Sequence, residues 1–362
     1  MKKFTTIFSA VAFLCTFANA QFVNTPPASK KAAVTEYIGL SKIHISYHRP
    51  GVKGREGKVY GNPNLVPYDG QPTPWRAGAN DNTIMYFGDD VQINGQDLPA
   101  GKYGFHIIPR ESGDWTLIFS NNNWSWGSYA YDEAEDALRV NAKASDCDHV
   151  EWLTYEFINQ TDNSADIRLS WESKSVTFSV STDLHATTMK HIESEIEHLK
   201  GFSWQGLNSA AQFAMNDEST LEKALGWADQ ASGNGFGAQK NFQTLSTKAQ
   251  ILDKMGKSDE AKTIMEKALA LGSITDLHFY ARSLIQAKKP KEALEIFEMN
   301  AKKNPDDNFT IFVGLARGNM AIENYESAAK YFKKAAPNAP QGQEQAYMDL
   351  AKQCEQKMTK GD

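Results

Sequence analysis

The sequence predicts a multidomain protein: an N-terminal antiparallel β-sandwich-like domain and a C-terminal all-α solenoid of helical hairpins. Apolar residues alternate with polar ones up to about residue 182 and then recur with a helical period. Turn sequences separate the alternating stretches, and a helix–turn–helix pattern repeats in the C-terminal part. The chain has 362 residues, of which 41% are hydrophobic and 23% charged, so it can fill two ordinary cores.

The first 20 residues have the three parts of a secretory signal. Lys2 and Lys3 give a positive start, Ile7–Phe17 is mostly apolar, and Ala18-Asn19-Ala20 is a small-x-small cleavage site. We therefore expect residues 1–20 to be a signal peptide and the mature chain to be exported. The apolar stretch is too short to span a bilayer comfortably and no second one follows, so no transmembrane segment is expected in the mature chain.

Residues 21–182 carry the strand signals. In Lys42–His48, Ile43, Ile45 and Tyr47 share one face of an alternating stretch. The strongest turn signal is Asn94-Gly95, because both residues tolerate the positive φ of a type I′ turn. Short strands with such turns between them favour an antiparallel sandwich or an open barrel. The further strand-like runs are Thr83–Phe87, Tyr103–Ile108, Trp115–Phe119, Ala137–Ala142, Val150–Ile158, Ala165–Trp171 and Val176–Val180.

A long irregular segment interrupts the strands between Arg49 and Gly78. It is rich in proline and glycine but also carries Tyr60, Tyr68 and Trp75. A long loop that bears aromatic residues is either functional or a packed cover for the core.

The helical half begins with an expected connecting helix in residues 183–202. Beyond it, small residues recur in register: Ala224, Ala261, Ala293 and Ala328 are separated by 37, 32 and 35 residues. Small residues at such intervals let paired helices approach closely. A second set, twelve residues before the last three of these, comprises Ala249, Ala281 and Ala316, and Pro305 and Pro340 stand where helices are expected to stop.

This pattern resembles the tetratricopeptide repeat, a helix–turn–helix unit of about 34 residues. The resemblance covers residues 203–340, and a capping helix and tail are expected at 341–362. Such hairpins stack because none can bury its apolar stripe alone, and the stack presents a concave surface. The resemblance therefore implies a protein or peptide partner.

The β-rich half also resembles a known family. The motifs are Tyr47–Gly51, Leu65–Tyr68, Trp75–Asn80, Leu98–Gly104 and Tyr129–Asp132. They are similar to those of an exported Bacteroidota family, domain of unknown function 2911, over about residues 25–180. The resemblance implies a β-sandwich-like domain and a location in the periplasm or at the cell surface of a Gram-negative bacterium. It implies no activity, so no catalytic residue is assigned.

Within these motifs, several side chains are candidates for ligand binding. Trp75, Arg76 and Asn80 are one set, because arginine stacks on indole and binds carboxylates or phosphates through a fixed fork. An anionic or sugar ligand would suit them. The alternative is a structural stack of Arg76 on Trp75 that pins the long loop to the sandwich. His48 and Arg49, at the start of that loop, complete this set.

A second candidate set follows three consecutive asparagines. Trp124, Trp126 and Tyr129 are closely spaced, and aromatic rings beside amide groups suit sugar stacking. The alternative is that these rings close one end of the sandwich core.

Metal and catalytic motifs are sparse. His44 and His48 would stand about 13 Å apart on one strand, too far to share an ion. A metal site shared by His48 and His106 is the remaining arrangement, and ordinary histidines on a polar strand face are the preferred interpretation. Nucleophile-elbow, phosphate-loop and zinc-protease motifs do not occur. We therefore predict no catalytic residue, no metal ligand and no cofactor.

The repeats carry candidate partner-binding residues. Arg282 and Arg317 follow the equivalent small residues Ala281 and Ala316, so they take the same position in neighbouring repeats. His278 lies one helical turn earlier. Two such arginines suit an acidic side chain or a peptide C-terminal carboxylate. The alternative is exposed arginines that balance local acidic groups.

The expected function is that of an exported, non-catalytic binding or scaffold protein. Its helical repeats would engage a protein or peptide, and the β-domain would hold a ligand of unknown kind. A formal charge of −6 without a long basic run disfavours nucleic acid as a partner. Two alternatives stay open: an accessory protein that binds or processes a glycan, and a hydrolase or metalloenzyme in the β-domain.

Overall fold

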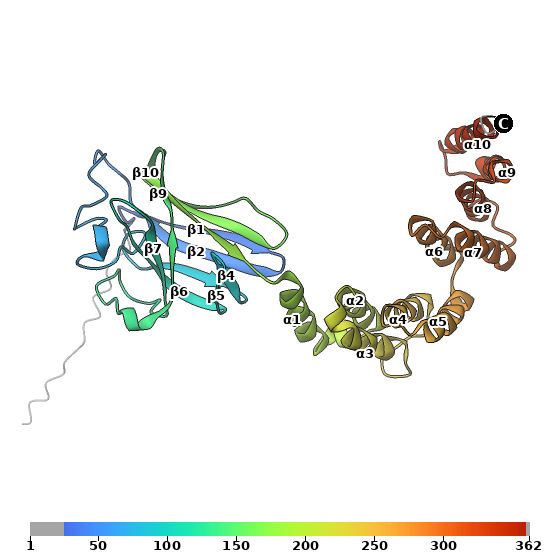
Figure 1. The fold of residues 1–362 in the computed structure, drawn as a ribbon, viewed down its shortest axis with the longest axis horizontal. Coiled ribbons are helices and arrows are strands. Elements are labelled where there is room, and N and C mark those ends of the chain that lie inside the picture. Colours follow the sequence, from blue (N-terminus) through green and yellow to red (C-terminus); the bar gives the residue numbers. More distant parts are fainter. Residues whose placement is uncertain (1–24, 360–362) are drawn as a thin grey trace, which may run out of the picture. The chain divides into compact units, whose positions relative to one another are not determined.

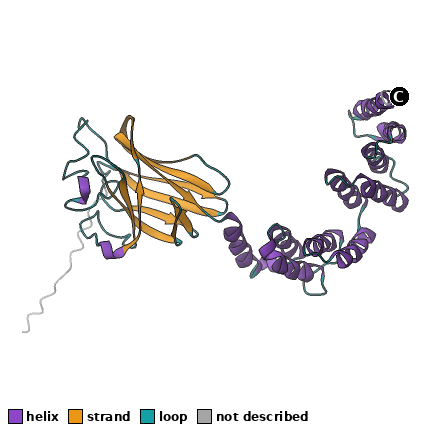
Figure 2. Ribbon diagram, in the orientation of Figure 1, coloured by secondary structure: helices purple, strands orange, loops and turns teal. Residues whose placement is uncertain are grey.

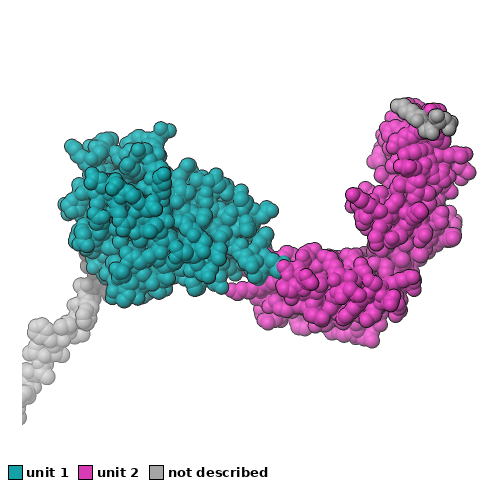
Figure 3. Space-filling model, in the orientation of Figure 1, with its two compact units in different colours: residues 1–187 teal, residues 188–362 magenta. Residues whose placement is uncertain are grey.

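The computed structural model describes residues 25–359, so the expected signal peptide at residues 1–20 lies outside the described part. The chain divides into two compact units, Met1–Thr187 and Thr188–Asp362, which we call the β-unit and the helical unit (Figure 3). Strands form the first unit and paired helices the second (Figure 2). The predicted fold class is confirmed.

The β-unit consists of two antiparallel sheets (Figure 1). The larger has the order β1 (Lys30–Ile38), β2 (Ser41–Arg49), β3 (Thr83–Phe87), β6 (Gly101–Ile108), β7 (Trp115–Ser120) and β8 (Asp136–Ala142). The smaller has the order β5 (Gln96–Leu98), β4 (Val91–Ile93), β10 (Ser164–Ser181) and β9 (Ala144–Ile158). Asn94 and Gly95, both with positive φ, join β4 to β5 as the predicted tight turn.

The core lies between the two sheets. Ile43, Ile45 and Tyr47 are all buried, as the alternation on β2 predicted. Aromatic rings from both sheets meet there, and the Phe105 ring on β6 stacks on the Phe178 ring of β10 with centroids 5.8 Å apart. The apolar faces of two sheets thus bury one another, which is what stabilises a sandwich.

The last strand differs from the prediction. The runs Ala165–Trp171 and Val176–Val180 are parts of the single strand β10, whose pairing with β9 is irregular around Glu172. Glu172 has a φ of 54°, and its buried carboxylate accepts hydrogen bonds from the backbone N–H of Ser173 (2.8 Å) and of Gly57 (3.0 Å). A local irregularity of this kind interrupts the alternation of apolar and polar residues, so the sequence pattern predicted two strands where there is one.

The long segment between β2 and β3 is a packed cover. The Tyr60 ring contacts the rings of Trp115 and Trp171, at centroid distances of 5.4 and 6.4 Å. Backbone groups of Trp75 and Ile107 exchange two hydrogen bonds of 2.8 Å. The segment therefore closes one end of the sandwich, as one of the two sequence interpretations proposed.

The helices are α1–α10, of which α2–α10 lie in the helical unit and α1 begins in the β-unit (Figure 1). Their bounds are α1 Leu184–Ile196, α2 Trp204–Ala214, α3 Leu221–Ser232, α4 Phe242–Lys254, α5 Ser258–Leu271, α6 Ile274–Gln286, α7 Pro290–Lys303, α8 Thr310–Ala321, α9 Tyr325–Ala335 and α10 Glu344–Met358. The pairs α2–α3, α4–α5, α6–α7 and α8–α9 pack against each other, and α10 packs on α9. No helix within residues 25–359 combines the length and the apolar character needed to cross a membrane.

Small residues stand at the closest helix contacts. The repeat alanines Ala224, Ala261, Ala293 and Ala328 are buried on the second helices of the pairs, as are Ala249, Ala281 and Ala316 on the first helices. A Cβ atom on Gly314 of α8 would lie 2.5 Å from the Phe297 ring of α7. The periodic small residues thus set how closely neighbouring helices pack.

Candidate functional site

The structure brings the three predicted partner-binding residues together. His278 and Arg282 lie one turn apart on α6, and Arg317 lies on α8, which packs against α6. Helix α6 begins with a capping box in which the Ser273 and Asp276 side chains bond each other's backbone. His278 and Arg282 are four residues apart and so share one helix face. That face lies toward α8, since a Cβ on Gly314 of α8 would lie 3.4 Å from His278 Nδ1. We call His278, Arg282 and Arg317 the cationic cluster.

The charges of the cationic cluster lower the pKa values of two of its members, His278 and Arg317. Burial, and then the charges of Arg282 and Arg317, lower the pKa of His278 below its ordinary value. Burial, and then Arg282, lower the pKa of Arg317. Positive groups that destabilise each other in this way gain when an anion enters between them.

The cationic cluster also contains unsatisfied polar atoms. The Nε of Arg317 and the Nδ1 of His278 are buried and have no hydrogen-bond partner within residues 25–359. Arg282 lies over the exposed ring of Phe279, with its guanidinium carbon 5.6 Å from the ring centre. Neither arginine forms an ion pair in the described part of the chain. Because buried polar atoms are normally hydrogen-bonded, these two atoms mark a place where a polar group of a ligand fits.

An aromatic surface lies on the β-unit. Trp124, Trp126 and Tyr129 belong to the segment between β7 and β8 and are 75%, 61% and 74% exposed. The rings of Trp126 and Tyr129 are nearly parallel, with centroids 5.7 Å apart. The Arg76 guanidinium lies over both rings, 5.1 Å from one and 5.4 Å from the other. Exposed aromatic groups of this size mark an interaction site.

Two glycines shape this segment. Gly104 on β6 lets the backbone carbonyl of Asn122 come within 2.2 Å of where a Cβ would stand. Gly127 has a φ of 70° and lies between Trp126 and Tyr129 in the sequence. Its lack of a side chain lets the Arg76 guanidinium lie directly against the backbone there. The segment is therefore held close to the sheet while its aromatic rings face solvent.

The other predicted ligand-binding residues of the β-unit have structural surroundings. Trp75 is 4% exposed and stacks on Trp171 with centroids 5.9 Å apart, so its ring belongs to the core and Arg76 does not stack on it. Arg49 donates from Nε to the Leu153 carbonyl (2.7 Å) and from Nη2 to Thr154 Oγ1 (2.6 Å), and so links the two sheets.

Asn80 and His48 lie near the aromatic surface. Asn80 has a positive φ, and its carbonyl accepts a 2.5 Å hydrogen bond from Arg76. His48 is buried on the outer face of β2, and burial is the main cause that lowers its pKa. Beside it is a half-open hollow of about 190 Å³, also lined by Asp81, Asn82 and Trp126.

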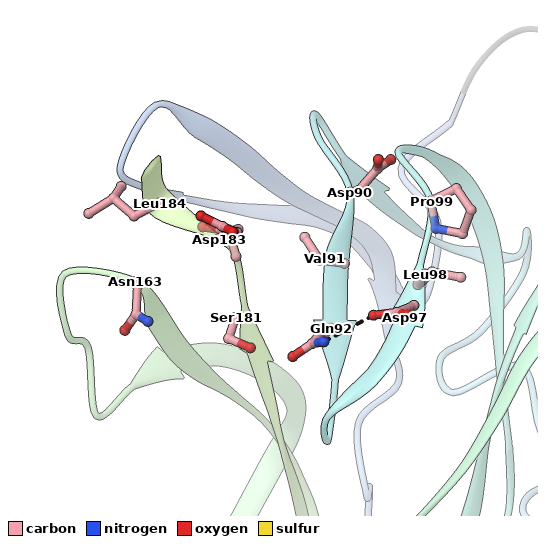
Figure 4. Close-up of a pocket in the computed structure, with 11 residues that line it drawn as sticks. Asp90, Val91, Gln92, Asp97, Leu98, Pro99, Asn163, Ser181, Asp183 and Leu184 are labelled. Atoms are coloured by element: carbon pink, nitrogen blue, oxygen red, sulfur yellow. Dashed lines mark hydrogen bonds between the residues drawn. The ribbon is translucent and has the colours of Figure 1, made fainter. Parts of the chain in front are cut away.

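A larger hollow of about 750 Å³ lies at another edge of the β-unit (Figure 4). Asp90, Asp97 and Asp183 contribute carboxylates to its lining, and Asp97 accepts a hydrogen bond from Gln92. Asp90 and Asp183 accept backbone hydrogen bonds from Ala100 and Ala186. These two carboxylates thus stabilise local turns. The sequence analysis did not predict this hollow.

One group within the described residues has metal-ligating chemistry. The ligand atoms of Glu56, His149 and Glu151 lie within 4.8 Å of one another. Neither His48 nor His106, the pair weighed from the sequence, belongs to it. Glu56 lies on the long loop, whereas His149 and Glu151 lie on β9. Because these segments are far apart in the sequence, no sequence motif indicated the cluster.

A buried serine–histidine pair bears on hydrolase chemistry. His106 Nδ1 lies 2.8 Å from Ser128 Oγ, and both residues are buried. Burial, and secondarily Arg76, lower the pKa of His106 to about 4. An imidazole with so low a pKa is a weak general base near neutral pH. The hydrogen bond between the two residues instead holds the segment between β7 and β8 against β6.

Comparison with known proteins gives a match in each of the two units. Residues 29–180 match the family described as "Protein of unknown function (DUF2911)", and residues 242–271 match the tetratricopeptide repeat. The second match coincides with the pair α4–α5. The search among curated proteins gave no match. The predicted resemblances to this family and to this repeat are confirmed, and the repeat match covers residues 242–271 of the expected 203–340.

Proposed function

We propose that this chain, with its DUF2911 domain at residues 29–180 and its tetratricopeptide repeat at 242–271, is a non-catalytic scaffold that binds an acidic segment of a protein partner. The cationic cluster is the binding site. The tetratricopeptide repeat suggests a protein partner, and the cluster supplies the chemistry that would recognise it.

One observation carries this proposal. Arg282 and Arg317 form no hydrogen bond and no ion pair within residues 25–359, although Arg317 is partly buried and its Nε is fully enclosed. Leaving a guanidinium desolvated and unpaired is costly. A carboxylate, from an acidic side chain or from a peptide C-terminus, would satisfy both arginines through charge-assisted hydrogen bonds.

Affinity capture with the full chain tests the proposal. Immobilised wild-type protein should retain a partner from a cell-envelope extract, and Arg282→Ala/Arg317→Ala should lose it. Lys262→Ala/Lys267→Ala is the matched control, because it removes two exposed positive charges from α5. Equal capture by the wild type and the double arginine variant would rule out the cationic cluster as the binding site.

Export belongs to the same proposal. The charged start, apolar stretch and cleavage site in residues 1–20 support delivery to the periplasm or the cell surface of a Gram-negative bacterium. Cell fractionation and N-terminal sequencing of the native protein test this. We expect a chain that begins at Gln21 in the envelope or extracellular fraction. A chain that keeps Met1 and stays in the cytoplasm would contradict it.

A further inference from the structure

We propose that the β-unit carries a glycan-binding site formed by Trp124, Trp126 and the hollow beside His48. The site is independent of the cationic cluster, since every residue in it belongs to the β-unit. Its ligand is a neutral oligosaccharide with one sugar ring in the hollow and further rings on the exposed aromatic side chains.

The hollow is built on the outer face of the larger sheet. Lys31 on β1 pairs with His48 on β2, and Ser46 on β2 pairs with Ile84 on β3, so these four residues form its floor. The segment between β7 and β8 supplies the wall with Trp124 and Trp126. Residues from three strands and two loops therefore converge on one space, since Asp81 and Asn82 precede β3.

The wall offers flat apolar surface to a ligand. Trp124 is 75% and Trp126 61% exposed, and both line the hollow. A sugar ring presents a face of C–H groups that packs on the negative face of an aromatic ring. Exposing two indoles to water is unfavourable, so a partner that covers them gains apolar burial.

The polar groups in the hollow match hydroxyl groups. Asn82 is buried, and its Oδ1 has no hydrogen-bond partner among the described residues. The Asp81 carboxylate and the His48 ring also line the hollow without a hydrogen bond in that part of the chain. A hydroxyl donates and accepts at once, so it can satisfy a carboxylate, an amide oxygen and an imidazole in turn.

The charges and the volume of the hollow limit the class of ligand further. Asp81 disfavours an anion in the hollow, and Lys31 disfavours a cation. A volume of about 190 Å³ is smaller than the 300–1,000 Å³ of ordinary small-molecule pockets, and suits a single ring. A neutral sugar residue at the end or bend of an oligosaccharide meets these conditions.

Titration of the full chain with defined sugars tests this site. The probes are the hexasaccharides of cellulose, xylan, mannan, starch and chitin, followed by tryptophan fluorescence and calorimetry. We expect at least one to bind saturably. Trp124→Ala and Trp126→Ala should each weaken that binding by about tenfold or more, a loss of at least about 1.4 kcal/mol.

Two further variants complete the experiment. Asp81→Asn, which keeps the size of the side chain, should weaken binding because it replaces an acceptor-only group. Phe236→Ala removes an aromatic side chain of the helical unit that is even more exposed, at 88%, and should leave binding unchanged. Failure of all five sugars to bind the folded wild type, or equal binding by both tryptophan variants, would overturn the proposal. Partner capture through the cationic cluster would be unaffected by either result.

Discussion

The arginines of the two units have opposite surroundings. The β-unit contains six, and each has oxygen partners: they are Arg49, Arg55, Arg76, Arg110, Arg139 and Arg168. The helical unit contains two, Arg282 and Arg317, and neither has a hydrogen bond or ion pair within residues 25–359. The β-unit therefore uses arginine to hold itself together. We propose that the helical unit uses its two arginines to bind a partner.

The same contrast holds for aromatic residues within the β-unit. Trp75 and Trp171 stack on each other in the core, whereas Trp124 and Trp126 remain largely exposed. Side chains of one chemical type thus stabilise the core in one place and, in our proposal, bind a ligand in another. Substitutions at matched pairs of residues distinguish these roles.

The largest effect is expected for a core tryptophan. Trp171→Ala should destabilise the β-unit by about 3–5 kcal/mol, because the ring is fully buried against Trp75 and Tyr60. Trp124→Ala should change stability by less than about 0.5 kcal/mol, because its ring is exposed. Chemical denaturation followed by far-ultraviolet circular dichroism measures both. Similar losses of unfolding free energy in the two variants would contradict the distinction between buried and exposed tryptophan rings.

Acid should weaken the β-unit through His106. Its folded-state pKa is about 4, below the ordinary value of 6.5, so the unfolded chain takes up the proton first as the pH falls. The contribution of the neutral His106 ring to the free energy of unfolding is fully present above pH 6.5. It is lost between pH 6.5 and 4 and amounts to on the order of 3 kcal/mol. His106→Asn should make this loss shallower in urea titrations at several pH values. An unchanged pH dependence in that variant would contradict the assignment to His106.

The arginine comparison predicts a smaller but more telling difference. Arg49→Met should cost the β-unit about 1–3 kcal/mol, because it removes the bonds to Leu153 and Thr154 that link the sheets. Arg317→Met should leave the helical unit equally stable or slightly more so, because it removes a desolvated charge next to Arg282 and keeps the apolar stem. Thermal melting checks both, and clear destabilisation by Arg317→Met would mean that this arginine is structural.

Local sequence patterns predicted what depends on neighbours along the chain. Alternation on β2 predicted the burial of Ile43, Ile45 and Tyr47, and the asparagine–glycine pair predicted a hairpin turn. Repeat register also placed Arg282 and Arg317 on neighbouring first helices. These features depend on strand and helix periodicity, which a sequence contains directly.

Contacts between distant segments were not predictable in this way. Trp75 and Trp124 both stand in loops between strands. Trp75 is buried because its ring stacks on Trp171, whereas Trp124 is exposed, and neither contact depends on residues nearby in the sequence. The approach of Glu56 to His149 and Glu151 likewise joins segments more than 90 residues apart. The sequence alone could name such residues as candidates but could not sort the packed ones from the accessible ones.

The central claim is that the unpaired arginines of the helical unit bind acidic groups. Selection from a random peptide library against the full wild-type chain, followed by titration of the selected peptides, tests it most directly. We expect the selected peptides to be rich in aspartate and glutamate, and Arg282→Ala/Arg317→Ala to bind them at least about tenfold more weakly than Lys262→Ala/Lys267→Ala does. Peptides without acidic residues, or equal binding by the two double variants, would contradict the claim.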